Sequence, residues 1–285
     1  MADGHLMDEN RPVTDHYAVI GNPIRHSKSP EIHKAFARAA GVDMDYTTIE
    51  AAPGGFLDAV RSFRERGGLG LNVTAPFKLE AYALADQRNE RAEAAGSVNT
   101  LKFSGGSVQA DNFDGIGLLR DIEDNLGYAI AGRRLLLLGA GGAARGIVHP
   151  LIARRPAELV IANRDPSRAR DVADRVRNGN PVRAGGYDVI GDAGFDLVIN
   201  ATSASMRGEL PPAASTIFRT DGLAYDLAYG LGMTPFLSLA RSAAVQRVAD
   251  GVGMLVEQAA ESFAWWRGIR PDTRAMISAL SVPLA

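Results

Sequence analysis

A run of leucines followed by glycines constrains the fold most strongly. Residues 135–138 are all leucine and lead directly into Gly139-Ala140-Gly141-Gly142-Ala143. Four consecutive apolar residues before such a turn predict a strand buried on both faces, as in a parallel sheet covered by helices. The glycines permit a tight turn and let the backbone approach a pyrophosphate, which the free amide groups of the next helix would stabilise. A purely structural turn is the alternative, but the strand, turn and helix together favour a dinucleotide site.

Strand-like and helix-like segments alternate on both sides of this motif. Before it, the hydrophobic pattern predicts strands at residues 17–20, 45–50, 69–73 and 98–103 and helices at 31–40, 56–66 and 77–85. After a helix at 114–126, it predicts strands at 134–138, 159–162, 195–200 and 223–227 and helices at 143–153, 166–176, 253–267 and 272–280. The alternation predicts an α/β protein with a first α/β domain and a doubly wound, Rossmann-like second domain.

Composition excludes several classes of function. With 285 residues, 46% of them hydrophobic, the chain can bury a large core and should form about two domains. A net charge of −2 gives no electrostatic footprint for nucleic acid, and no apolar run is long enough to span a membrane. The lack of cysteine excludes thiolate catalysis and cysteine-based metal sites, and five scattered histidines do not suggest a metal. We therefore expect a cytoplasmic protein without a metal, whose polar residues 1–16 form a disordered leader.

Lysine is rare among the basic residues. Of 31 basic residues only four are lysines, namely Lys28, Lys34, Lys78 and Lys102. Arginine does not release its proton in a protein, so a basic site that transfers a proton requires lysine. Lys78 is expected in the first turn of a helix, where a cation opposes the helix dipole unless an anion lies nearby. Asp114 is the candidate anion, although a solvated Lys78 and a helix-capping Asp114 are the plainer alternatives.

Two hydroxyl side chains, Ser27 and Ser29, lie on the loop between the first expected strand and the first helix. Both stand where a strand stops and free backbone N–H groups begin, a setting that suits a polyhydroxylated ligand. Ser29 followed by Pro30 is also typical of a helix N-cap. The alternative is therefore that Ser29 only caps the helix and Ser27 is solvated.

The end of the next strand predicts which dinucleotide binds. An NAD site usually carries Asp or Glu there for the ribose 2′-hydroxyl, whereas an NADP site carries Arg for the 2′-phosphate. This chain has Asn163 and Arg164, with Arg168 one turn further on. Two guanidinium groups favour NADP because they can pair with a dianionic phosphate. Asp165 before Pro166 fits a helix N-cap, but its charge leaves room for some use of NAD.

Eight motifs follow one another along the chain. They are Gly-Asn-Pro-x-x-His-Ser-Lys-Ser-Pro, Asn-Val-Thr-x-Pro-Phe-Lys, Gly-x-Val-Asn-Thr, Asp-Asn-x-Asp-Gly, Gly-Ala-Gly-Gly-Ala, Asn-Arg-x-x-x-Arg-Ala, Asn-Ala-Thr-Ser and Asp-Gly-x-Gly-Met-Leu-x-x-Gln-Ala. From about Tyr17 to the C-terminus the chain thus resembles the shikimate dehydrogenases, in which these motifs occur in the same order. It departs from the family at Phe113, where Thr is expected, and at Asp165, where NADP-preferring members often have Thr.

The resemblance implies a two-domain enzyme that reduces 3-dehydroshikimate to shikimate with NADPH, in the route to aromatic amino acids. It implies a substrate-binding domain at residues 17–113, an NADP-binding domain at 114–253, and C-terminal helices at 254–285 that return to the first domain. The side chains implied to line the substrate site are Ser27, Ser29, Asn72, Thr74, Lys78, Asn99, Asp114 and Gln258.

The resemblance also places residues around the nicotinamide. Tyr229 and Met254 would lie where substrate and nicotinamide meet, and Gly251 would lie beside the nicotinamide. Thr202 ends a strand at the carboxyl edge of the second sheet, where nucleotide ligands bind, so we expect it to touch the cofactor.

The chemistry then requires an acid near the ketone oxygen, because a proton must reach that oxygen as hydride reaches the carbon. We expect Lys78 to supply the proton and Asp114 to orient it, with coupled titrations, although the sequence leaves open which of the two is the donor proper. Two other functions stay open at this point. One is a quinate/shikimate dehydrogenase with mixed NAD and NADP use, and the other is a non-catalytic ligand sensor on the same fold. We expect a monomer or a homodimer.

Overall fold

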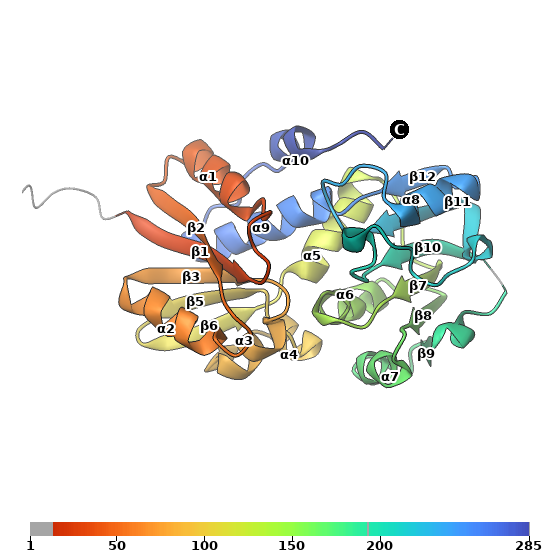
Figure 1. Ribbon diagram of the computed structural model, residues 1–285, viewed down its shortest axis with the longest axis horizontal. Helices are drawn as coiled ribbons and strands as arrows, with labels where there is room; N and C mark the ends of the chain where they lie inside the picture. Colours follow the sequence, from red (N-terminus) through yellow and green to blue (C-terminus); the bar gives the residue numbers. More distant parts are fainter. Residues whose placement is uncertain (1–13, 193, 285) are drawn as a thin grey trace, which may run out of the picture.

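The computed structural model describes residues 14–192 and 194–284, so most of the expected leader, residues 1–16, lies outside the described residues. Figure 1 shows two sheets side by side, each with its own helices, and the α/β prediction is confirmed. Strand β1 (Asp15–Gly21) begins two residues earlier than expected. The reason is that its parallel ladder to β2 (Met44–Glu50) already starts at Asp15, which lies opposite Met44.

The first sheet has six strands in the order β2-β1-β3-β5-β6-β4. Strand β1 is parallel to both β2 and β3, whereas β5 is antiparallel to both β3 and β6, so this sheet is mixed. Its remaining strands are β3 (Gly68–Val73), β4 (Gln87–Arg88), β5 (Thr100–Ser104) and β6 (Ser107–Asp111). Its helices are α1 (Ser29–Ala40), α2 (Phe56–Glu65), α3 (Lys78–Leu84) and α4 (Glu90–Ala95).

The hairpin between β5 and β6 is missing from the sequence prediction. Gly105 and Gly106 form its two-residue connection, with φ angles of 57° and 84°. Two left-handed residues in succession match the twist of the flanking strands, and glycine adopts that conformation without steric cost. The pair of glycines is the signal that predicts this hairpin. Its consequence is functional, because β6 leads directly to Asp114.

The second sheet has the order β12-β11-β10-β7-β8-β9, and each of its neighbouring strand pairs is parallel. This is the strand order of a Rossmann fold, in which the ligand crevice opens at the carboxyl ends of the two strands where the order reverses. Here those strands are β7 and β10. The strands are β7 (Arg134–Leu138), β8 (Glu158–Ala162), β9 (Val182–Gly185), β10 (Phe195–Asn200), β11 (Phe218–Asp226) and β12 (Arg247–Ala249).

Helices cover both faces of this sheet, as the apolar strands predict. They are α6 (Gly142–Ala153), α7 (Pro166–Asp174) and α8 (Pro235–Ser242), with short 3-10 helices η2 (Tyr187–Ile190), η3 (Ser205–Arg207) and η4 (Ser215–Ile217). The prediction omits β9, β12 and α8. The two strands are short and lie at the sheet edges, and both contain exposed arginines that hide the period of a strand.

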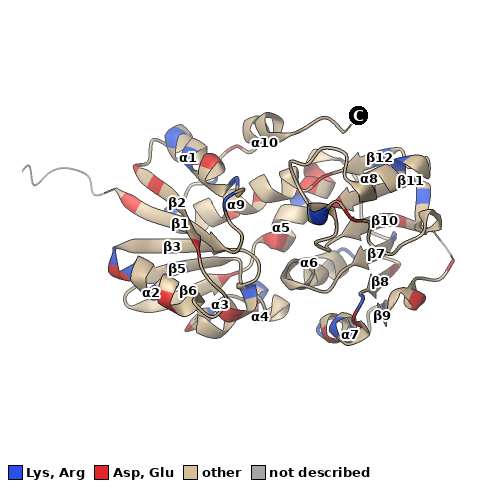
Figure 2. Ribbon diagram, viewed as in Figure 1, with Lys and Arg blue, Asp and Glu red and all other residues tan. Residues whose placement is uncertain are grey.

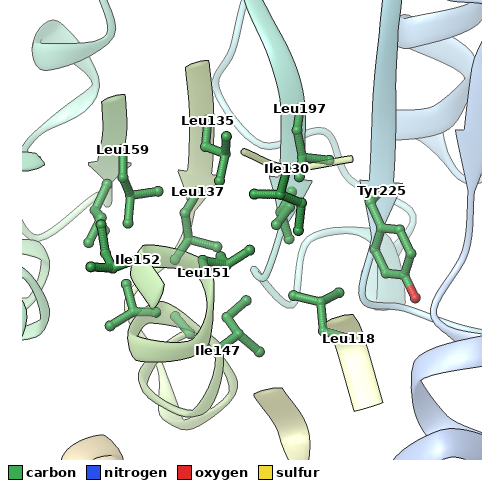
Figure 3. Packing of buried hydrophobic residues seen from close by; sticks show 14 of the residues in the cluster. Leu118, Ile130, Leu135, Leu137, Ile147, Leu151, Ile152, Leu159, Leu197 and Tyr225 are labelled. Carbon is green, nitrogen blue, oxygen red and sulfur yellow. The ribbon is translucent and has the colours of Figure 1, made fainter. Parts of the chain in front are cut away.

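Alternate leucines of β7 pack on opposite faces. Leu135 and Leu137 contact a cluster that includes Ile147 and Leu151 of α6 (Figure 3). Leu136 and Leu138 pack into a second cluster on the other face, with Phe236 of α8. Full burial of one leucine stabilises the fold by about 1.5–3 kcal/mol, so this strand fixes the glycine-rich turn that follows it.

The chain crosses between the two sheets twice, through α5 (Asp114–Leu119) with η1 (Arg120–Asn125), and through α9 (Val252–Arg267). The helix expected at 114–126 is present, but its second half is π-helical rather than α-helical from Arg120 on. That change accompanies a hydrogen bond from buried Tyr225 to Asp121, which the wider turn permits.

Helix α9 returns to the first sheet. Its Val256, Ala259, Ala260, Phe263 and Trp266 join one cluster with residues of β1, β2 and α1, and α10 (Arg274–Leu280) packs against the same cluster. The first sheet therefore buries one face against a helix from the far end of the chain.

Charges of both signs are interspersed over both sheets and their helices (Figure 2). Within the described residues, no helix is both long enough and apolar enough to cross a membrane. The same part of the chain contains no group of three or more His, Asp or Glu side chains that could hold a metal ion.

Candidate active site

Lys78 and Asp114 form a direct ion pair between the two units. Lys78 is the first residue of α3 and Asp114 the first residue of α5. The Nζ atom of Lys78 donates a hydrogen bond to Oδ2 of Asp114 at 2.5 Å, and the two side chains are only 13% and 6% exposed. The anion that the helix dipole at Lys78 requires is therefore Asp114. A solvated lysine, the plainer alternative, does not describe this structure.

The second oxygen of Asp114 is also held. Asn99 donates from Nδ2 to Oδ1 of Asp114 at 2.8 Å and to Oε1 of Gln258 at 3.2 Å. The Oδ1 atom of Asn99 accepts the backbone N–H of Phe113 at 2.9 Å. Asn99 thus links the approach to α5 with α9, which fixes the orientation of the carboxylate. The alternative that Asn99 is only a turn residue is wrong, because its amide is buried and bonded on both sides.

Asp114 does not cap its helix. Phe113 occupies the N-cap position, and the backbone N–H of Asp114 donates to Oδ1 of Asn112 at 3.1 Å. Asn112 is thereby a residue that the sequence argument overlooked, although it stands in the Asp-Asn-x-Asp-Gly motif. The unexpected Phe113 ring packs edge-on against Trp265, with centroids 5.9 Å apart.

Asn72 lies at the end of β3 in a buried polar network and is not a turn residue. The Tyr46 hydroxyl donates to Oδ1 of Asn72 at 2.7 Å. The Nδ2 atom of Asn72 donates to Ser262 at 2.9 Å and to Thr100 at 3.1 Å. Tyr46 and Ser262 were not predicted. A serine on the buried face of α9, one turn after Gln258, is the signal that could have identified the second of them.

The loop that carries Ser27 and Ser29 does not form the helix N-cap that the sequence predicts. Lys28 occupies the N-cap position without a side-chain hydrogen bond, and Ser29 is the first helical residue. The reason is that the carbonyl of Lys28 already accepts the N–H of Ile32, so the helix begins one residue early. The Oγ atom of Ser27 accepts the N–H of Ser29 at 3.3 Å. The hydroxyl of Ser29 is buried yet takes no part in capping.

The loop that carries Ser27 and Ser29 lies against the loop that leads to Lys78. The backbone N–H of Thr74 donates to the carbonyl of Ile20 at 3.0 Å, and that of Asn22 donates to Ala75 at 3.0 Å. A Cβ atom on Gly21 would lie only 2.4 Å from Cγ2 of Thr74. Glycine at position 21 therefore allows half-buried Thr74 to approach the loop that carries the two serines.

The glycine-rich turn lies between β10 and Lys78. Gly139 has a φ angle of +106°, and a Cβ atom there would lie 2.9 Å from the carbonyl oxygen of Ala201. A Cβ atom on Gly142, the first residue of α6, would lie 3.3 Å from Cβ and Cδ of Lys78. Gly141 has no heavy atom within 4 Å of such a position. The turn is thus open at Gly141, with Ala140 buried behind it and Ala143 in the first turn of the helix.

The end of β8 carries the predicted selectivity residues. Arg164 and Arg168 are exposed, and within the described ranges neither forms a salt bridge. Asp165 caps α7 as expected, accepting the N–H of Ser167 at 3.0 Å and its hydroxyl at 2.7 Å. The Ser167 hydroxyl, followed by its N–H, lowers the pKa of Asp165, so this carboxylate is ionised at neutral pH. Asn163 bonds to the carbonyl of Asp165 at 2.9 Å.

The remaining predicted residues surround the junction of the units. Gly251 precedes α9, and a Cβ atom there would lie 2.4 Å from the carbonyl oxygen of Leu227. Met254 is buried in the cluster beneath β7. Thr202 bonds to Asn200 through both its N–H, at 3.1 Å, and its hydroxyl, at 2.7 Å. Tyr229 is half-buried, which raises the pKa of its hydroxyl, and no hydrogen bond within the described ranges joins it to the other predicted site residues.

The Rossmann-type sheet, with a buried lysine–aspartate pair beside its glycine-rich turn, defines a dinucleotide-dependent α/β oxidoreductase. Three family models match the chain. They describe a shikimate dehydrogenase substrate-binding domain at residues 19–101, shikimate/quinate 5-dehydrogenase at 121–207, and a shikimate 5′-dehydrogenase C-terminal domain at 251–280. The chain belongs to the shikimate dehydrogenase family.

Individual relatives agree with this assignment. The chain is 54% identical over 268 residues to shikimate dehydrogenase (NADP(+)) of Nitrosospira multiformis, covering 94% of this chain and 98% of that protein. The crystal structure of an Ael1 enzyme from Pseudomonas putida is 53% identical, with a TM-score of 0.88, and the match covers 95% of this chain and all of that one. Shikimate 5-dehydrogenase from Thermus thermophilus, crystallised with NADP(H) and shikimate, is 29% identical with a TM-score of 0.83, covering 93% and 98%.

Proposed function

We propose that this protein is an NADP-dependent shikimate dehydrogenase, which reduces 3-dehydroshikimate to shikimate reversibly in the route to aromatic amino acids. The observation that carries the proposal is the position of Lys78. Its ammonium is bonded to Asp114, while its aliphatic stem lies against Gly142 at the start of the phosphate-binding helix. A proton-transfer pair therefore adjoins the place where a dinucleotide would lie.

The residues present fit NADP(H). Open space at Gly141 and the unpaired amide groups of the first turn of α6 suit a pyrophosphate. The exposed guanidinium groups of Arg164 and Arg168 suit a 2′-phosphate. When bound there, NADPH supplies the hydride that a ketone needs to become an alcohol. We place Gly251, Met254 and Thr202 on the cofactor side of the site, together with the glycine-rich turn from Gly139 to Ala143.

The proton goes to the oxygen of the substrate. A lysine ammonium has three N–H donors, and Asp114 uses only one of those on Lys78, so another can point at the substrate. Asp114 is held by Asn99 on its other oxygen, which keeps the pair aligned through proton transfer. Since a direct hydrogen bond of 2.5 Å joins Lys78 to Asp114, the pair acts together as the acid–base unit in this proposal.

The remaining side chains bind the substrate in this proposal. The hydroxyls of Ser27 and Ser29 hold its carboxylate, because neutral donors suffice for an anion in a shielded site. Asn72, Thr74, Asn99, Gln258 and Tyr229 hold its hydroxyl groups and ring.

The domain assignment follows from these roles. We propose that residues 17–113 form the substrate-binding domain, 114–253 the NADP-binding domain, and 254–285 a helical extension that packs on the first domain. A cytoplasmic location and a monomeric or homodimeric state are part of the same proposal.

A direct assay tests the function. The purified chain should oxidise NADPH only when 3-dehydroshikimate is present, and should reduce NADP+ when shikimate is added. A chain that binds shikimate but turns over neither substrate would instead be a ligand sensor. The same assay with quinate and with NAD tests the mixed-specificity alternative, which the ionised carboxylate of Asp165 at the end of β8 favours.

A further inference from the structure

Asp226, the last residue of β11, is completely buried and belongs to none of the groups assigned above. Its Oδ2 atom accepts the hydroxyls of Ser205 at 2.5 Å and Thr234 at 2.7 Å. Its Oδ1 atom accepts Nδ2 of Asn200 and the backbone N–H of Ala228, both at 3.1 Å. Four donors, two from residues 200–205 and two from residues 228–234, therefore converge on one side chain. No lysine or arginine within the described residues forms a salt bridge with it.

The hydrogen bonds continue from Asp226 toward the crevice. Asn200, held through Nδ2 by Asp226 and by Ser205, accepts both the N–H and the hydroxyl of Thr202 on Oδ1. The hydroxyl of Thr202 then accepts the N–H of Ala204 at 3.2 Å. The side chains of Thr202 and Asn200 are thus each oriented by the next group in the series, which ends on Asp226.

This loop forms one wall of the glycine-rich turn. A Cβ atom on Gly139 would lie 2.9 Å from the carbonyl oxygen of Ala201 and 3.2 Å from the backbone nitrogen of Thr202. Gly139 directly follows β7 and Asn200 ends β10, the two strands between which the order of the sheet reverses. A ligand in that crevice therefore contacts a loop whose shape depends on Asp226.

Asp226 also fixes the start of the loop that carries Tyr229. Its bond to the N–H of Ala228 turns the chain just before Tyr229, and the carbonyl of Ala228 in turn accepts the N–H of Gly251 at 2.9 Å. One carboxylate hence orders a loop on the pyrophosphate side and a loop on the nicotinamide side.

We propose that Asp226 is a positioning residue for NADP(H), which holds the residue 200–204 loop in the shape that the cofactor binds. This inference rests on the proposed NADP site. Removal of the carboxylate takes away one of the two acceptors of the Asn200 amide, and hydrogen bonds to charged groups are among the stronger ones in proteins. Asp226→Ala should accordingly weaken NADPH binding about tenfold or more.

The experiment measures the dissociation constant of NADPH for the complete chain by nucleotide fluorescence, without shikimate. Asp226→Asn is the conservative variant. Its amide oxygen still accepts from Asn200 and Ala228, and its NH₂ group faces the hydroxyls of Ser205 and Thr234. It should restore binding to within about threefold of the unmodified chain. In steady state, Asp226→Ala should raise the KM for NADPH and leave the KM for shikimate within about twofold.

Thr234→Val is the matched control. It removes a donor to the same carboxylate and the cap of α8, whose N–H comes from Leu237, but leaves Asn200 untouched. It should lower the melting temperature without changing the NADPH dissociation constant. If Thr234→Val and Asp226→Ala weakened NADPH binding equally, Asp226 would act only through general stability, and the proposal would be overturned. Unchanged binding in Asp226→Ala would do so as well.

A milder variant covers the case in which Asp226→Ala does not fold. Ser205→Ala removes the hydroxyl that donates to Asp226 at 2.5 Å and that accepts from Asn200. It should raise the NADPH dissociation constant about threefold. No change in that variant would contradict the proposal. If the unmodified chain itself fails to bind NADPH, the proposed function fails first.

Discussion

The substrate side and the cofactor side of the site are held by different kinds of contact. Asn72, Asn99 and Asp114 are buried, and each has hydrogen bonds to side chains from other elements. Arg164 and Arg168 are exposed at the edge of the second sheet. Under the proposed function, the proton-transfer geometry is therefore fixed before substrate arrives, whereas recognition of the 2′-phosphate relies on separate surface charges. Chemistry and cofactor choice should therefore respond to mutation independently.

The largest effect is expected at the buried pair. Lys78→Ala should lower kcat by roughly 100-fold or more and leave the KM for shikimate within a few-fold, because acid–base catalysis contributes about that factor. Asp114→Asn should also be severely impaired, and the double variant should lose much less than the product of the two losses. Lys34→Ala, which removes an exposed lysine on α1, is the control for loss of one positive charge. An unchanged kcat in Lys78→Ala would exclude this lysine from the mechanism.

At the cofactor edge, Arg164→Ala should cost about 1.5–3 kcal/mol of NADP binding and hardly change NAD binding. Arg168→Ala should act in the same direction with a smaller effect. Arg170→Ala is a matched control. Arg170 lies two positions after Arg168 in α7, and residues two positions apart on a helix point to different faces. The measurement is the ratio of kcat/KM for NADP to that for NAD. An unchanged ratio in Arg164→Ala would make NAD the better cofactor assignment.

Substitution of Ser27 and Ser29 tests whether substrate binding can be weakened without a change in cofactor binding. Ser29→Ala and Ser27→Ala should each weaken shikimate binding by about 1–3 kcal/mol, since a buried carboxylate oxygen loses a donor. NADP affinity should not change. Ser242→Ala, at the exposed end of α8, should alter neither constant. A normal KM for shikimate in both variants would remove the serines from the site.

The buried side chain of His33 also predicts that the free energy of unfolding depends on pH. His33 of α1 packs against α9 and is stacked on Tyr46, and complete burial lowers its pKa to about 3. An unfolded histidine binds its proton near pH 6.5, so between about pH 6.5 and 3 the unfolded state binds the extra proton. This contribution to stability is complete above pH 6.5 and is lost as the pH falls, by up to about 1.4 kcal/mol per pH unit.

Urea unfolding between pH 4.5 and 7 measures that slope. His33→Leu should flatten it, whereas replacement of the exposed His149 by Gln should leave it unchanged. A slope in His33→Leu equal to that of the unmodified chain would assign the acid sensitivity to other groups.

The smallest effect concerns Asp165. Asp165→Thr should raise the preference for NADP a few-fold by removing a negative charge near the 2′-phosphate. Threonine is a slightly poorer cap for α7, so stability should fall by about a few tenths of a kcal/mol. A shift of the kcat/KM ratio toward NAD would show that this carboxylate does not repel the phosphate.

Local patterns in the sequence predicted most of the fold. The leucine run, its glycine turn and the following helix depend on neighbouring residues only, and the structure has each of them in place. The same holds for the helix start at Lys78 and the cap at Asp165. The β5–β6 hairpin also has a local signal in Gly105-Gly106, which the helix-and-strand alternation obscured.

Other features depend on residues that meet only in space. Asn72 bonds to Ser262, 190 positions away, and Asp226 gathers donors from residues 200–205 and 228–234, so neither network has a period or spacing to detect. The π-helix at Arg120 coincides with a contact between Asp121 and Tyr225, which are 104 residues apart. The ion pair of Lys78 was anticipated only because a cation at a helix start demands an anion.

Because α9 returns to the first sheet, the two sheets cannot be completed in the order in which they are synthesised. All six strands of the second sheet lie within residues 134–249, so that sheet can form while synthesis is still in progress. The first sheet emerges earlier but must wait for Phe263 and Trp266, which cover Tyr17 and Tyr46, and for Ser262, which completes the network of Asn72. The part synthesised first is thus the last to be completed, because its aromatic face can be covered only after residues 252–267 have been made.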